Sequence, residues 1–186
     1  MRCFVAIETE KETHELIEQL QSNLRKLPGR FSFGNPKTAH ITLTFLGEID
    51  KSKSREIKTM LCELAKKHRT FTLKTTHVGV FPSKEHVRTV WLGIAPNDAL
   101  LRIHEDLNRP NHNAKEQHPK FTPHITIARV NYVKDKRELK KVLDAVKKID
   151  ETKIVVREIK LKKSTITPQG PVYSDVGAYR LREKHE

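Results

Sequence analysis

A chain of 186 residues with 36% hydrophobic and 32% charged residues can bury one good core, and none of its apolar runs approaches the roughly 20 residues that a transmembrane helix needs. The net charge of +13 favours a polyanionic partner, with nucleic acid as the first candidate, while an aromatic content of 6% argues against a protein that holds single strands on many stacking platforms. Because residues 2–7 read as a strand and not as a secretion signal, we expect a cytoplasmic protein that binds no membrane.

The first half of the chain alternates between the periodicities of strands and helices. We expect a strand, an amphipathic helix, a strand, a second amphipathic helix and two further strands, over residues 2–7, 11–27, 40–46, 52–68, 70–81 and 86–95. The first helix ends at Pro28-Gly29, and the strand after it ends at Gly47.

The second half repeats the order of helix, strand, helix and two strands. Its first helix starts near residue 97, where Asn97 and Asp98 are candidate caps, and the later elements cover residues 121–130, 134–149, 152–167 and 172–181. A polar segment, residues 108–120, is expected to be a long loop. Residues 134–163 carry twelve basic and six acidic side chains, a partly solvated charged surface.

This order predicts an α+β fold in one domain over residues 1–186. We expect a two-lobed, pseudo-symmetric duplication that divides near residues 95–100, in which each lobe is a mostly antiparallel sheet with helices on its outer face. An active-site cleft would lie between the lobes.

The two cysteines, Cys3 and Cys62, form neither a disulfide framework nor a metal-ligand spacing, so we expect buried, reduced thiols. Four histidines of the second half are spaced irregularly, without cysteines or paired carboxylates nearby: His104, His112, His118 and His124. A zinc site is therefore not expected, and no cofactor is indicated.

The tripeptide His-Ile-Thr occurs twice, starting at His40 and at His124. Side chains alternate between the two faces of a strand, so the first copy should bury one face and present His40 and Thr42 on the other. The residues expected in the core are Ile41, Leu43 and Phe45. With a rise of about 3.3 Å per residue, each histidine and its threonine are close enough to reach one phosphate.

In the second copy Ile125 and Ile127 are expected to point inward, with His124 and Thr126 outward. One such tripeptide could be a polar strand face with a chance histidine. Two copies at comparable positions of similar halves favour a shared site.

Two facing histidines have unperturbed pKa values of about 6.5, so near neutral pH one can accept a proton while the other donates one. In-line attack on a phosphodiester needs both steps. The Thr42 and Thr126 hydroxyls can donate hydrogen bonds to the non-bridging oxygens, and this arrangement requires no metal. The residues alone leave open which histidine is the acid.

Residues 38–48 and 121–129, which contain the two tripeptides, resemble the paired motifs of the 2H phosphoesterase superfamily. With residues 78–82 and 164–173, essentially the whole chain resembles the RNA 2',3'-cyclic phosphodiesterases, also called 2'-5' RNA ligases. The resemblance implies hydrolysis of RNA 2',3'-cyclic phosphate ends to 2'-phosphates, with His40 as proton donor and His124 as proton acceptor. It also implies ATP-independent joining of 2'-5' linked ends.

The same resemblance assigns Arg129 to substrate contact. Strict alternation would bury Arg129, so it must lie at the strand end or beyond a bulge. RNA is the expected partner of a monomeric protein, and tRNA halves, cyclic nucleotides and ADP-ribose derivatives all present a suitable phosphate.

Two other functions remain open: a non-catalytic module that binds RNA ends, and a metal-dependent phosphoesterase. Three aromatic residues could stack on a base, although core packing is favoured for them: Phe4, Phe81 and Trp91. The remaining histidines are expected to be ordinary surface residues: His14, His68, His77, His86 and His185.

Overall fold

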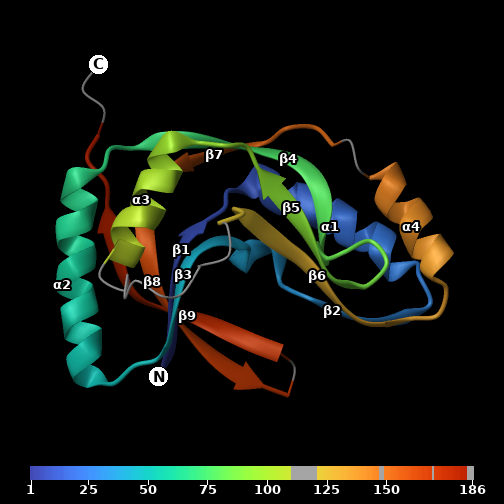
Figure 1. Ribbon diagram of the computed structural model, residues 1–186, viewed down its shortest axis with the longest axis horizontal. Coiled ribbons are helices and arrows are strands. Elements are labelled where there is room, and N and C mark those ends of the chain that lie inside the picture. Colours follow the sequence, from blue (N-terminus) through green and yellow to red (C-terminus); the bar gives the residue numbers. More distant parts are fainter. Residues whose placement is uncertain (110–120, 147–148, 169, 184–186) are drawn as a thin grey trace.

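The computed structural model describes residues 1–109, 121–146, 149–168 and 170–183 (Figure 1). Within these residues nine strands form a sheet whose neighbours pair antiparallel, and four helices pack against it, which confirms the α+β class. The strands are β1 (Arg2–Glu8), β2 (Gly29–Phe33), β3 (His40–Glu48), β4 (Phe71–Pro82), β5 (Val87–Ile94), β6 (His124–Val133), β7 (Lys153–Val156), β8 (Glu158–Thr167) and β9 (Gly170–Arg180). The helices are α1 (Lys11–Arg25), α2 (Lys51–Lys67), α3 (Asp98–Asn108) and α4 (Lys136–Ala145), with one 3-10 turn, η1 (Pro36–Thr38).

The strand order is β7-β4-β5-β6-β3-β1-β8-β9, with β2 added on β6. Most neighbouring strands share several register positions, but β3 and β6 meet at one pair, Ile41 with Ile125. The sheet therefore consists of two groups of strands joined at this pair. Both groups draw strands from either side of residues 95–100, where the sequence predicts a division.

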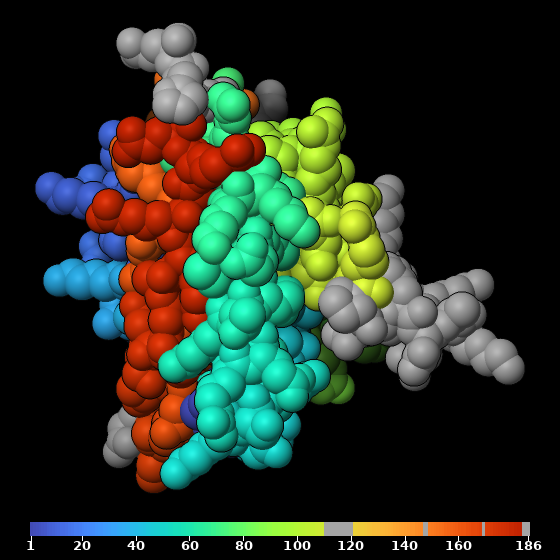
Figure 2. All heavy atoms as spheres, turned by 90° about the vertical axis from the view of Figure 1, so that its left-hand side faces the viewer, coloured from blue at the N-terminus to red at the C-terminus, as the bar shows by residue number. Residues whose placement is uncertain are grey.

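Helices α1, α2 and α3 bury most of the apolar stripes that their periodicity predicts, while α4 buries only Leu139. Cys62, on α2, is exposed, so the prediction that it is buried is wrong. In α2 the buried residues include Ile57, Leu61 and Leu64, and Figure 2 shows this helix between α3 on one side and β8 and β9 on the other. Asn97 caps α3, since its side chain accepts a hydrogen bond from the Leu100 amide. In the described ranges, no helix is both long and apolar enough to cross a membrane.

The segment predicted as one strand over residues 152–167 is two strands. The break is at Arg157. Before this residue β7 pairs with β4, and after it β8 pairs with β1 in the other group of strands. The Arg157 carbonyl accepts a hydrogen bond from the Leu181 amide instead of continuing either ladder. Of the predicted loop at residues 108–120, positions 110–120 lie outside the described residues, as do His112, His118 and His185.

A β-bulge in each motif strand interrupts the expected alternation. In β3, Ala6 pairs with Thr42 and Val5 with Thr44, so Leu43 is an extra residue on that strand. The bulge reverses the side chains that follow, and the prediction that Phe45 is buried is wrong: it is 77% exposed.

Candidate active site

The junction of the two strand groups carries the repeated tripeptides. Ile41 and Ile125 are fully buried, as predicted, and they pair across the junction. Continuing this antiparallel register by one residue sets His40 across from Thr126 and sets Thr42 across from His124. All four side chains lie on the face opposite the isoleucines, which we call the shared face. Each histidine therefore stands near the threonine of the other motif.

Both imidazoles are held by the same local hydrogen bond. His40 Nδ1 lies 2.9 Å from the Thr38 carbonyl oxygen, and His124 Nδ1 lies 2.7 Å from that of Thr122. Because a carbonyl oxygen only accepts, Nδ1 carries the proton in each ring. Nε2 is then the nitrogen left to exchange protons with a bound molecule on the shared face.

Aromatic rings pack against each histidine. Phe4 and Tyr173 lie 4.9 Å and 5.0 Å from the His40 ring, measured between centroids. Phe81 and Trp91 lie 5.0 Å and 6.0 Å from the His124 ring. Phe4 and Trp91 are themselves buried, as core packing predicts. These contacts limit the rotation of both imidazoles.

Burial lowers the pKa of His40 below its ordinary value. The hydrogen bond to the Thr38 carbonyl works in the opposite direction, the Lys162 ammonium adds to the lowering, and the Glu8 carboxylate offsets part of it. In the free protein His40 thus favours its neutral form. An anion bound at Nε2 would favour protonation.

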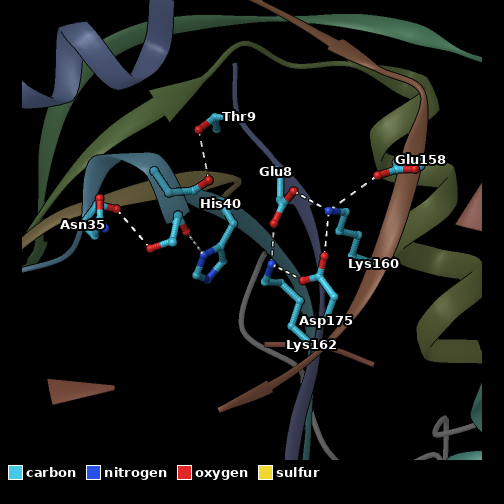
Figure 3. A network of polar contacts seen from close by, with 10 residues as sticks. Glu8, Thr9, Asn35, His40, Glu158, Lys160, Lys162 and Asp175 are labelled. Atoms are coloured by element: carbon cyan, nitrogen blue, oxygen red, sulfur yellow. Dashed lines mark hydrogen bonds and ion pairs between the residues drawn. The ribbon is translucent and has the colours of Figure 1, made fainter. Parts of the chain in front are cut away.

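A group of four charged side chains lies beside His40 (Figure 3), and the sequence did not single it out. We call it the charge square: Glu8, Lys160, Lys162 and Asp175. Only the alternation of Lys160 and Lys162 along β8 could have marked it, and in sequence these two residues read as part of a solvated basic segment.

Arg129 lies beyond a bulge, as its predicted role requires. In β6, Thr126 pairs with Trp91 and Ala128 with Val90, so Ile127 is the extra residue. Arg129 is exposed and turns to the side of the sheet that carries Trp91 and the shared face.

Two of the histidines expected to be ordinary surface residues are not, since His14 buries its Nε2 atom and His68 is largely buried in an ion pair. His68 Nε2 lies 2.8 Å from Asp106 between α2 and α3, with 11% of its side chain exposed. His104 Nδ1 donates to the carbonyl of Leu43, the bulged residue of β3, at 2.8 Å. By contrast, His77 and His86 are exposed, as expected.

One apolar cavity among the described residues is separate from the two histidines. It has a volume of about 650 Å³ and lies between the β4–β5 hairpin and α4, with Val78, Val80 and Leu139 among its lining residues. Trp91 lines it and also contacts His124. Among the described residues, no group of three or more His, Cys, Asp or Glu side chains could hold a metal ion.

A family model described as the 2'-5' RNA ligase superfamily matches residues 7–163. This chain belongs to that superfamily. An RNA 2',3'-cyclic phosphodiesterase of Thermotoga maritima is 33% identical over 174 residues, which cover 93% of this chain and 91% of that protein. One of Methanocaldococcus jannaschii is 32% identical over 93% of this chain and 96% of that protein.

A solved structure shares the fold of this chain. The crystal structure of the protein TT0787 of Thermus thermophilus matches this chain with a TM-score of 0.81 and 23% identity over the whole of both chains. This likeness shows the fold alone. The family model and the relatives named above confirm the predicted family and the prediction that the chain is an enzyme of the cyclic phosphodiesterase class.

Proposed function

We propose that this protein hydrolyses RNA 2',3'-cyclic phosphate ends to 2'-phosphates, with His40 and His124 as the proton-transfer pair and without a metal ion. The observation that carries the proposal is the matched pair of Nδ1 hydrogen bonds on two strands that meet at one register pair. It leaves two Nε2 atoms on one face, as in-line displacement at phosphorus requires.

In the proposed reaction His124 Nε2 takes a proton from water as the water oxygen attacks phosphorus. The bond between phosphorus and O3' breaks, and O3' takes a proton from His40 Nε2. The product is a 2'-phosphate beside a free 3'-hydroxyl. This polarity follows the family resemblance. The lowered pKa of His40 is compatible with it because the phosphate anion of the substrate stabilises the protonated ring.

The threonines are proposed to stabilise the transition state. Among the described residues, neither the Thr42 nor the Thr126 hydroxyl has a protein hydrogen-bond partner, so both can donate to non-bridging phosphate oxygens. Such donors are most effective when they are fixed before the reaction, and the buried isoleucine between each histidine and its threonine fixes both.

Arg129 is proposed to bind the RNA backbone, because the guanidinium of this exposed residue, which follows His124 on β6, suits a phosphate. The relatives' names support RNA as the substrate, with tRNA halves among the candidates. A 5'-hydroxyl in place of water would give ATP-independent 2'-5' ligation by the same proton transfers.

The test is incubation of an RNA bearing a 2',3'-cyclic phosphate with the protein and a metal chelator, followed by phosphorus NMR. A 2'-phosphate product is expected. A 3'-phosphate would contradict the polarity, and loss of turnover in chelator would favour a metal-dependent enzyme. Binding without product at any pH would instead favour an RNA-end-binding module.

A further inference from the structure

The charge square shares a sheet face with His40. Glu8 pairs directly with His40 in the register of β1 and β3. Along β1, Ala6 and Phe4 follow Glu8 on the same face, and they pair with Lys160 and Lys162 of β8. Lys162 in turn pairs with Asp175 of β9. The square therefore spans three adjacent strands next to the strand that carries the histidine.

Its contacts form a closed ring. Lys160 Nζ donates to Glu8 Oε2 at 2.6 Å and to Asp175 Oδ2 at 2.8 Å. Lys162 Nζ donates to Glu8 Oε1 and, at 2.6 Å, to Asp175 Oδ1. Each carboxylate thus binds both ammonium groups through separate oxygens. A third carboxylate, Glu158, lies outside the ring with its Oε1 atom 3.7 Å from Lys160 Nζ (Figure 3), so three negative charges surround the two ammonium groups.

Burying these charged side chains costs free energy unless each charge is paired. The Lys162 side chain is 4% exposed and that of Lys160 is 16% exposed, while Glu8 and Asp175 are partly open to solvent. Burial alone would lower the pKa of Lys160, but its hydrogen bonds to Asp175 and Glu8 raise the pKa above the ordinary lysine value. Both lysines are therefore occupied within the protein and do not serve as free phosphate ligands.

The square reaches His40 in two ways. Phe4, which pairs with Lys162, and Tyr173, two residues before Asp175 on β9, are the rings that pack on the imidazole. Ion pairs between β1, β8 and β9 hold these two rings in place. The square also places charge near His40, directly through Lys162 and Glu8 and indirectly through Lys160 and Asp175, which bind those two residues. The other titratable groups nearby are Glu158, which pairs with Lys160, and Tyr173 and His124.

We propose that the charge square is a positioning device for His40, which holds the Phe4–His40–Tyr173 stack and, because its two carboxylates are bound by its own lysines, leaves the imidazole without a permanent counterion. The substrate phosphate then becomes the anion that pairs with the protonated ring. The importance of this device for catalysis rests on the proposed function, but its effect on His40 does not. Lys160, Lys162, Glu8 and Asp175 act through His40 and are not catalytic residues themselves.

The test is an NMR titration of the His40 imidazole in the full chain, labelled with ¹⁵N-histidine. Lys162→Met keeps the buried aliphatic stem and removes one positive charge, so the pKa of His40 should rise. Asp175→Asn removes one negative charge, so the pKa should fall below that of the wild type. The double variant Lys162→Met/Asp175→Asn keeps the net charge of the wild type and should return the pKa of His40 toward the wild-type value.

Lys163→Met is the matched control, because Lys163 loses the same charge one residue away on the opposite face, where it pairs with buried Cys3. Asp175 is 43% exposed, so Asp175→Asn should remain folded even if Lys162→Met does not. Opposite shifts in the single variants support the proposal. Shifts in the same direction, or none, or an equal shift in the control, would overturn it. Since the titration needs no turnover, failure to hydrolyse a cyclic phosphate would count against the proposed function alone.

Discussion

The two motif strands carry the same irregularity at the same place. Leu43 in β3 and Ile127 in β6 each stand three residues after the histidine, and each is the extra residue of a bulge. The fifth residue after each histidine is thereby turned outward: an exposed aromatic ring, Phe45, in one strand and an exposed cation, Arg129, in the other. The backbone is repeated, but the side chains that it presents are not.

The surroundings of the two histidines differ in the same way. His40 packs against Phe4 and Tyr173 beside the charge square. His124 packs against Phe81 and Trp91, and in the described part of the chain no comparable ring of ion pairs lies beside it. The two histidines proposed to transfer protons thus stand in different environments, which is how two identical side chains can take opposite roles.

Removing either imidazole should have the largest effect. His40→Ala and His124→Ala should each lower kcat on an RNA 2',3'-cyclic phosphate by about 10²- to 10⁴-fold, the usual contribution of a general acid or base. Both variants should stay folded, because Ile41 and Ile125 hold the strands. Single-turnover kinetics measures the loss, with the exposed His86→Ala as the control. Wild-type rates in either variant would contradict the account.

The threonines should come next. Thr42→Val and Thr126→Val remove one hydroxyl each, and each should lower kcat roughly 10- to 100-fold by loss of a transition-state donor. The two effects should be similar, because each threonine lies across from the histidine of the other motif. The exposed Thr72→Val is the control. A loss of kcat in only one of the two variants would contradict the proposal that both threonines donate to the phosphate.

Lowering the pH should reduce the free energy of unfolding, because the ion pairs beside His40 are lost. Burial alone would raise the pKa of Glu8 and of Asp175, but hydrogen bonds from Lys160 and Lys162 outweigh it and lower both. Their contribution to stability is full above the ordinary carboxyl pKa values of about 4 and is lost as the pH falls through the lowered values. Asp175→Asn should therefore make the free energy of unfolding less dependent on pH in this acidic range, measured by urea unfolding. A surface-pair control, Glu10→Gln, should change this dependence little.

The smallest effect is expected at Arg129. Arg129→Gln should weaken RNA binding only a few-fold and reduce the salt dependence by about one phosphate contact, with kcat nearly unchanged. Filter binding at several salt concentrations measures it, with the exposed Arg137→Gln on α4 as the control. An unchanged salt dependence would remove Arg129 from the RNA-binding surface.

Local pattern predicted the elements and the direction of the motif side chains, because alternation and helical periodicity are set within a few residues. The local pattern did not predict the bulges. The run from Ile41 to Phe45 alternates without interruption, and only the pairing of β3 with β1 shows that Leu43 is an extra residue. Arg129 was expected at the strand end or beyond a bulge because the family resemblance gives it a substrate contact, which strict alternation would prevent by burying the side chain.

Pairing between residues far apart in the sequence explains the remaining differences between the predicted and the observed structure. Lys160 and Lys162 read as solvated because nothing in their own segment shows that Glu8, more than 150 residues away, lies beside them. The break at Arg157 was hidden for the same reason, since β7 and β8 form one continuous strand-like pattern but pair in different groups. Sequence can place a side chain on a face of a strand, while the partner of that strand comes from the tertiary fold.

The most direct test of the central claim uses an RNA 2',3'-cyclic phosphate in which sulfur replaces the 3' bridging oxygen, because a thiolate leaves without a proton. If His40 is the proton donor and His124 the acceptor, His40→Ala should hydrolyse this substrate nearly as fast as the wild type, and His124→Ala should remain inactive. Rescue of His124→Ala instead, or of neither variant, would contradict the division of roles between the two histidines.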